Sequence, residues 1–204
     1  MKSLLLTAAV SALALGANAQ ISLIPEAGVN LANIRSTVAG EKSTSSTKAG
    51  FRGGVNVGIA VGNNLSIQPG IFFSQKGGSQ ETMGVTTQSV INYVEIPVNL
   101  VYYFMEDQSG FFLNAGAYAA AAVSGYGKIG DQKIDYSIGG DEAKDDIRRW
   151  DVGFQGGAGY QTKMGLMLRA QYILGAMNIS SHNNSDYSTR NGAINISLGY
   201  KFGW

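Results

Sequence analysis

Apolar and polar residues alternate with a period of two along eight segments of this 204-residue chain. The segments are residues 21–34, 49–61, 65–77, 89–104, 111–124, 149–161, 165–178 and 191–204. Successive side chains of a β-strand point to opposite faces, so each segment predicts a strand with one apolar face. A usual strand has about five or six residues, whereas a tilted membrane-spanning strand needs about 9–11. The pattern therefore predicts an all-β protein built from eight long strands.

The connections between these segments differ in length. Three are short and contain turn-forming residues, at 62–64, 105–110 and 162–164. The other four are longer and rich in Ser, Thr, Gly, Asn and charge, which predicts exposed loops at 35–48, 78–88, 125–148 and 179–190. Short periplasmic turns and long extracellular loops are typical of an outer-membrane β-barrel.

The two strand faces distinguish a membrane barrel from a soluble lipocalin-like barrel, whose apolar residues face inward. In the last segment Ile194 and Ile196 share one face, whereas Asn195 and Gly199 share the other. The polar faces contain many of the 28 glycines and few charges, which suits the narrow lumen of an eight-stranded barrel. A soluble protein would not leave so large an apolar face in water. We therefore predict an eight-stranded antiparallel up-and-down transmembrane β-barrel with its apolar face against lipid.

Ionisable side chains gather on the face predicted to line the lumen. An isolated buried ion costs several kcal/mol, so these charges must be paired or hydrated. We predict a paired polar network that plugs the barrel, although a gate or solute path is the alternative. Its predicted members are Glu26, Arg52, Lys76, Glu95, Arg149, Asp151, Arg169 and Lys201. We expect Glu26, Arg52, Glu95 and Arg169 nearest its middle.

Aromatic residues on the apolar face lie near the ends of the predicted strands. Membrane barrels carry such aromatic girdles where the bilayer meets water. The predicted girdle residues are Phe51, Phe73, Tyr102, Phe104, Phe111, Trp150, Tyr160, Tyr200, Phe202 and Trp204.

The N-terminal residues have the pattern of a secretory signal peptide. Lys2 is followed by an apolar stretch at 4–15 and by the small-residue site Ala17-Asn18-Ala19. We predict a signal peptide at 1–19, cleavage before Gln20, and a barrel domain at 20–204. The predicted location is the outer membrane of a Gram-negative bacterium.

Composition and motifs argue against several kinds of chemistry. The 15 Lys and Arg nearly balance 14 Asp and Glu, which gives no electrostatic footprint for nucleic acid. The absence of cysteine excludes a thiol nucleophile and a cysteine metal site. His182 has Ser and Asp neighbours, but a catalytic triad needs a buried carboxylate that holds the base. The acidic segment 141–146 lacks the spacing of an EF-hand. We predict no catalytic, cofactor or metal site.

Several strand motifs together have a family likeness. They are FSQKG at 73–77, YVEIPV at 93–98, NAGAY at 114–118, and a glycine-rich strand at 153–160 followed by RAQY at 169–172. Together they resemble the PorT-like outer-membrane β-barrel family common in Bacteroidetes, over essentially the whole mature chain. The resemblance implies an eight-stranded outer-membrane barrel, and the family's namesake is linked to a specialised secretion pathway. The terminal Trp204 resembles the signal read by the barrel-assembly machinery.

The function predicted from these features is a structural or interaction role through the long loops. The alternatives are a narrow pore or secretion accessory, a lipid-modifying enzyme and a soluble carrier. The predicted partners are outer-membrane lipid, the barrel-assembly machinery and an extracellular or secretion-system protein. We expect deletion of the loop 125–148 to leave the barrel folded.

Overall fold

The computed structural model describes residues 20–203 except 39, 83, 131, 140, 142–143 and 182–186. Long strands account for most of the described chain, and each overlaps one of the predicted segments. They are β1 (Ile21–Val38), β3 (Lys48–Ala60), β4 (Leu65–Thr82), β5 (Val85–Tyr103), β6 (Gly110–Ile129), β10 (Trp150–Gln161), β11 (Leu166–Gly175) and β12 (Tyr187–Tyr200). No helix in this part of the chain is long and apolar enough to cross a membrane.

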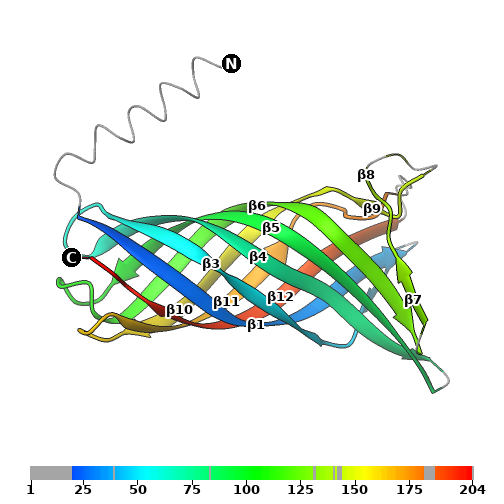
Figure 1. Cartoon of the computed structure of the whole chain (residues 1–204), viewed down its shortest axis with the longest axis horizontal. Helices are drawn as coiled ribbons and strands as arrows, with labels where there is room; N and C mark the ends of the chain where they lie inside the picture. Colours follow the sequence, from blue (N-terminus) through cyan, green and yellow to red (C-terminus); the bar gives the residue numbers. More distant parts are fainter. Residues whose placement is uncertain are drawn as a thin grey trace, which may run out of the picture.

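These eight strands close into a ring. Each pairs antiparallel with the next long strand in the sequence, and β12 pairs with β1. The register places Glu26 opposite Gly199 at this closing seam. Figure 1 shows the barrel from the side, with strongly tilted strands, and with the start of β1 and the end of β12 at the same end of the barrel. The prediction of an up-and-down antiparallel barrel is confirmed.

The two ends of the barrel differ. The short-turn end contains the links 61–64, 104–109 and 162–165. The long-loop end contains four short strands and flares outward in Figure 1. These short strands are β2 (Glu41–Thr44), β7 (Gln132–Asp135), β8 (Ile138–Gly139) and β9 (Ile147–Arg148).

One predicted loop is instead a hairpin. The prediction of an exposed loop at 78–88 is wrong, because β4 and β5 continue through it and pair up to Thr82 and Val85. Gly84 has a φ of 77°, a left-handed conformation that glycine adopts without steric cost. The remaining Ser, Thr and Val residues are compatible with extended backbone, and the ladder satisfies their backbone groups.

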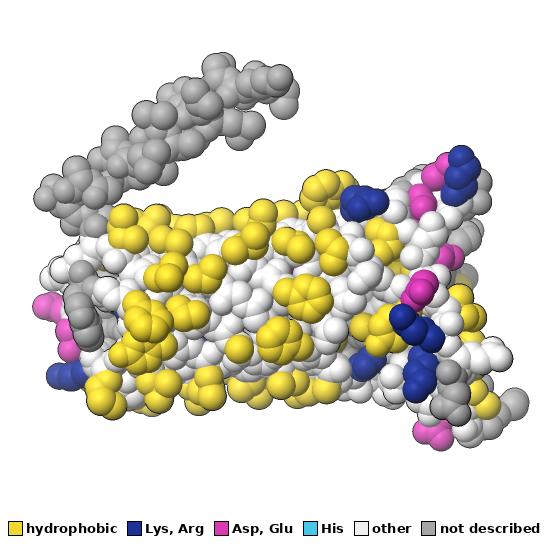
Figure 2. Space-filling view, viewed as in Figure 1, with side chains coloured by type: hydrophobic (Ala, Val, Ile, Leu, Met, Phe, Trp, Pro, Cys, Tyr) yellow, Lys and Arg dark blue, Asp and Glu magenta, His cyan; other side chains and the backbone are white. Residues whose placement is uncertain are grey.

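The apolar face of the barrel points outward. Leu100 and Ile196 are 50% and 48% exposed, whereas Arg169 and Asn195 on the opposite face are 1% and 0% exposed. Figure 2 shows hydrophobic side chains over the barrel wall, with charged side chains gathered at its two ends. A soluble carrier would show the reverse arrangement.

Candidate functional site

A layer of paired charges fills the middle of the lumen. The Glu95 carboxylate on β5 lies 2.8 Å from Arg52 Nη2 on β3 and 3.0 Å from Lys76 Nζ on β4. Lys76 Nζ also lies 3.5 Å from Asp151 Oδ2 on β10. These four residues are all buried.

A second group in the same layer centres on Glu26 of β1. Its carboxylate lies 3.5 Å from Arg169 Nη2 on β11 and accepts hydrogen bonds from Asn56 Nδ2 at 2.6 Å and Ser197 Oγ at 3.2 Å. Arg169 also donates to Gln68 Oε1 at 2.7 Å. Glu26 and Arg169 are likewise buried.

We call these six ionisable residues the charged layer. Its three cations and three carboxylates balance formally, so the layer itself has no net charge. They come from six different strands and join the walls of the barrel to one another. Breaking one buried pair would leave its partner uncompensated, which costs about 3–5 kcal/mol. The members of the charged layer are Glu26, Arg52, Lys76, Glu95, Asp151 and Arg169.

Inward-facing aromatic rings pack against these cations. The Arg52 guanidinium lies 4.0 Å from the centroid of Phe72, and Lys76 Nζ lies 3.9 Å from that of Tyr118. Such cation–π contacts are stronger when the groups are desolvated. Sequence reasoning assigned no role to Phe72 and Tyr118. Phe72 lies four residues before Lys76 on β4, and Tyr118 lies four residues after Asn114 on β6, so each ring shares the inward face of its strand with a polar residue. This spacing is the sequence signal that could have predicted their position in the lumen.

Two apolar clusters lie on either side of the charged layer. The cluster toward the short-turn end contains Ile24, Val101, Tyr103, Phe112 and Met167. The cluster toward the long-loop end contains residues from the strand walls and two residues from the loops, Ile147 and Ile179. The partly buried side chains of Tyr136 and Ile138 pack against this second cluster. The segment 125–148 is therefore not wholly a solvated loop, because part of it closes the lumen.

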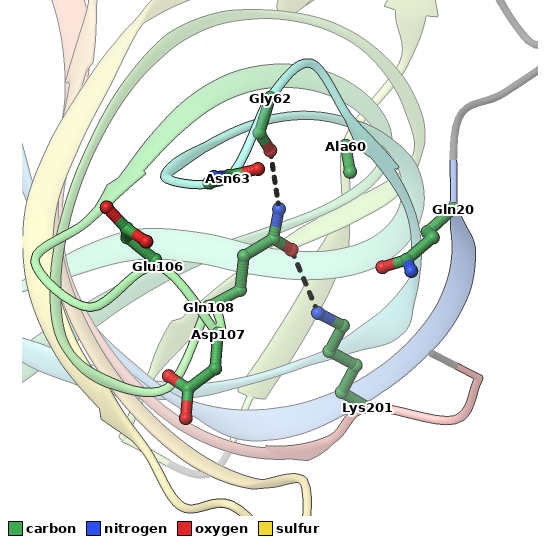
Figure 3. Close-up of a pocket in the computed structure, with 8 residues that line it drawn as sticks. All are labelled: Gln20, Ala60, Gly62, Asn63, Glu106, Asp107, Gln108 and Lys201. Carbon is green, nitrogen blue, oxygen red and sulfur yellow. Dashed lines mark hydrogen bonds between the residues drawn. The ribbon is translucent and has the colours of Figure 1, made fainter.

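Figure 3 shows the short-turn mouth, where a hollow of about 510 Å³ surrounds Gln108. Gln108 Nε2 donates to the Gly62 carbonyl at 3.3 Å, and its Oε1 accepts from Lys201 Nζ at 3.0 Å. Gln161 Nε2 donates to the Gln108 carbonyl at 2.7 Å. The turn between β5 and β6 therefore folds across the opening.

Lys201 belongs to this mouth rather than to the charged layer. It is half-buried and bonds to Gln108, one residue beyond the end of β12. Burial lowers the pKa of the Lys201 ammonium group, and the Asp107 carboxylate opposes that change. Hydrogen bonding from Ser109 lowers the pKa of Asp107 in the same turn.

Arg149 does not join the predicted network, contrary to expectation. Its side chain is exposed, and its Nη2 donates to the Ile138 carbonyl at 3.1 Å. The reason is that β10 begins at Trp150, so the inward–outward alternation of that strand does not extend to Arg149.

The predicted girdle residues within the described chain are all exposed on the outer wall. At the short-turn end their rings pack in pairs, with centroids 5.0 Å apart for Phe111 and Tyr160 and 4.6 Å apart for Tyr200 and Phe202. Trp204 lies outside the described residues, as does the predicted signal peptide at 1–19. Whether these rings mark the membrane interfaces stays a prediction.

The other candidate chemical groups lie in the long-loop segments. His182 is outside the described residues. In the acidic segment, Asp145 accepts hydrogen bonds from Ser137 Oγ at 3.0 Å and from the Asp141 backbone at 2.8 Å. Asp146 accepts from the Ser137 backbone at 2.9 Å. These carboxylates therefore hold the loop's own backbone.

The closed ring, apolar outer wall and polar lumen define a small transmembrane β-barrel. The chain belongs to the outer membrane protein beta-barrel domain family, whose profile matches residues 17–181. Members of this class reside in the outer membrane. No curated protein sequence matches the chain.

Solved structures of other barrels are similar in fold. Neisserial surface protein A has a TM-score of 0.50 and 15% identity, over 89% of this chain and 97% of that one. Ail, the attachment invasion locus protein of Yersinia pestis, has a TM-score of 0.49 and 14% identity, over 90% and 99% of the two chains. OprG from Pseudomonas aeruginosa has a TM-score of 0.43 and 12% identity, over 92% and 98%. At these identities, the similarity to Neisserial surface protein A concerns the fold alone.

Proposed function

We propose that this protein is a closed outer-membrane barrel with a structural or interaction role, without solute transport or catalysis. The observation that carries the proposal is the filling of the lumen. The charged layer, which is at most 4% exposed, lies between two apolar clusters, and Gln108 lies across the short-turn mouth. An eight-stranded barrel has room for little more than these side chains.

The long-loop end supplies the surface for such a role. At this end β4 and β5 pair as far as Thr82 and Val85, β7 pairs with the end of β6, and β2 pairs antiparallel with the end of β1. Loops held on a rigid scaffold commonly carry binding functions. The proposed partners are outer-membrane lipid around the wall, an extracellular or secretion-system protein at this end, and the barrel-assembly machinery during biogenesis.

Channel recording in planar bilayers tests the closed lumen. Membrane fractionation and a heat-modifiability gel would first establish that the protein used is a folded outer-membrane barrel. We expect no stable openings from the natural protein or from Glu81→Gln, which changes an exposed carboxylate on the β4–β5 hairpin. Stable openings whose conductance changes in Glu95→Gln would overturn the proposal.

A narrow pore or secretion accessory is the second candidate, favoured by the PorT-like resemblance of the strand motifs. A pore would show conductance in the bilayer recordings, and a secretion accessory would cause a secretion defect when its gene is deleted. A closed barrel with a structural or interaction role would show neither. A lipid-modifying enzyme is a third candidate. It would turn over lipopolysaccharide, and His182→Ala would abolish the turnover.

A further inference from the structure

A second hollow, of about 420 Å³, lies on the outer wall at the long-loop end. Three basic side chains, several hydroxyl groups and two apolar side chains of the wall line it. The basic residues are Arg35, Lys42 and Arg190, and the apolar ones are Phe154 and Leu174. We call it the rim hollow. Figure 2 shows Lys and Arg side chains gathered at this end, where the apolar wall stops.

The strand register concentrates positive charge at this position. Arg35 of β1 and Arg190 of β12 are direct cross-strand partners, so both side chains project from the same face of the sheet. Lys42 of β2 is the partner of Thr37, which lies on the same face of β1 as Arg35. Like charges directly opposite each other destabilise a strand pair. The arrangement is thus unfavourable without a neutralising group.

Within the described residues, no carboxylate forms an ion pair with any of these three cations. Arg35 Nη2 donates to the Asn191 carbonyl at 3.2 Å, while Arg35 Nε is buried without a hydrogen-bond partner. Gly192 leaves room for the Asn33 and Arg35 side chains, because a Cβ there would lie 2.7 Å from Asn33 Oδ1 and 3.3 Å from Arg35 Nε. An anion with several oxygens would satisfy the free donor and neutralise the paired guanidinium groups.

The apolar part of the rim hollow indicates what carries that anion. Phe154 and Leu174 are cross-strand partners on β10 and β11, and both belong to the lipid-facing wall. A single ligand in the hollow would meet hydrocarbon contacts on one side and guanidinium groups on the other. In an outer-membrane barrel the long-loop end lies at the outer leaflet.

We propose that the rim hollow binds a phosphate-bearing lipid of the outer leaflet whose headgroup has a net negative charge. Arg35 and Arg190 bind the phosphate, Lys42 adds a third positive charge, and an acyl chain lies against Phe154 and Leu174.

Native mass spectrometry from non-ionic detergent micelles tests this proposal. The probes are a diphosphorylated glycolipid of the lipid A type, phosphatidylcholine and inorganic phosphate. The natural protein should retain the glycolipid in preference to phosphatidylcholine. Loss of two charge-assisted contacts in Arg35→Gln/Arg190→Gln should weaken glycolipid binding at least about tenfold.

The matched control is Lys128→Gln/Lys133→Gln, which removes the same charge from β6 and β7 at the same end of the barrel and should bind like the natural protein. Should the double arginine variant fail the heat-modifiability check, Arg190→Gln alone, at an exposed position, gives a weaker loss in the same direction. Equal binding by the arginine and lysine variants would overturn the proposal. So would equal retention of phosphatidylcholine, or complete displacement of the glycolipid by millimolar inorganic phosphate, which would indicate a site for a free anion.

Discussion

At the scale of single residues, Glu95 shows how a barrel tolerates charge in its interior. Its two carboxylate oxygens contact different cations: Oε1 contacts Arg52 on β3, and Oε2 contacts Lys76 on β4. Desolvation of a lone carboxylate at 0% exposure would be costly, and two close cations offset that cost. The geometry makes Glu95 the central anion of the charged layer.

Replacing Glu95 by Gln should therefore destabilise the folded barrel. The amide keeps the shape but leaves Arg52 and Lys76 without their shared carboxylate, so we expect a loss of about 3–5 kcal/mol in the free energy of unfolding. Urea unfolding of protein refolded into lipid vesicles would measure it. The control Glu81→Gln, at an exposed hairpin position, should change stability by less than about 0.5 kcal/mol. Equal stability of the two variants would contradict the role given to Glu95.

At the scale of elements, the loop containing β8 and β9 does more than connect strands. Ile147 of this loop is 8% exposed and lies in the apolar cluster that closes the long-loop end, together with Ile179 of the β11–β12 connection, which is 2% exposed. Ile134, on β7 in the same connection, is 57% exposed. The connection thus has one anchored part and one solvent-facing part.

We expect Ile147→Ala to release the anchored part without unfolding the ring. Loss of buried methyl groups weakens the local packing, whereas the barrel ladder is untouched. Limited trypsin digestion should then cut the segment 132–149 at least about fivefold faster than in the natural protein, a factor that corresponds to about 1 kcal/mol. Ile134→Ala should digest at the natural rate. If Ile147→Ala abolished the heat-modifiable band, the loop would be part of the folding core instead.

At the scale of the whole molecule, an outward apolar wall and an inward polar lumen require lipid around the barrel. Val98 is 49% exposed, whereas its neighbour three residues earlier, Glu95, is fully buried. Around the ring, apolar side chains are exposed on the outer wall and polar side chains are buried in the lumen, which is the opposite of a soluble barrel. Stability of this protein is therefore inseparable from its bilayer.

An arginine substitution on the outer wall tests whether that wall faces lipid. Val98→Arg should destabilise the protein by about 2–4 kcal/mol in vesicles, because the bilayer midplane does not solvate the charge. Met164→Arg, in the short turn 162–165 where residue 164 is 73% exposed, should cost about 0–1 kcal/mol. Unfolding titrations in vesicles of one lipid composition would compare them. A similar cost at both positions would argue against the lipid-facing assignment of Val98.

Much of the fold could be predicted because alternation is a property of neighbouring residues. Period two, strand length and turn chemistry are local, so they located all eight long strands and the three short turns. The alternation of apolar and polar residues does not predict where the register between two paired strands shifts. At the β5–β6 irregularity Asn92 pairs with Ser124 and Tyr93 with Ala122, so Val123 is an additional residue that no local pattern reveals.

The sequence alone thus determined the ring of strands, its lipid-facing wall and the inward parity of residues such as Glu26, Arg52 and Arg169. Only the tertiary structure decided which charges meet, since Lys76 and Asp151 are brought together across the lumen from strands far apart in the chain. It also decided that Arg149 is exposed, that Lys201 bonds at the short-turn mouth, and that loop residues close the long-loop end. The physical reason is that parity fixes the side of a strand on which a residue lies, whereas contacts across a barrel depend on tilt and register.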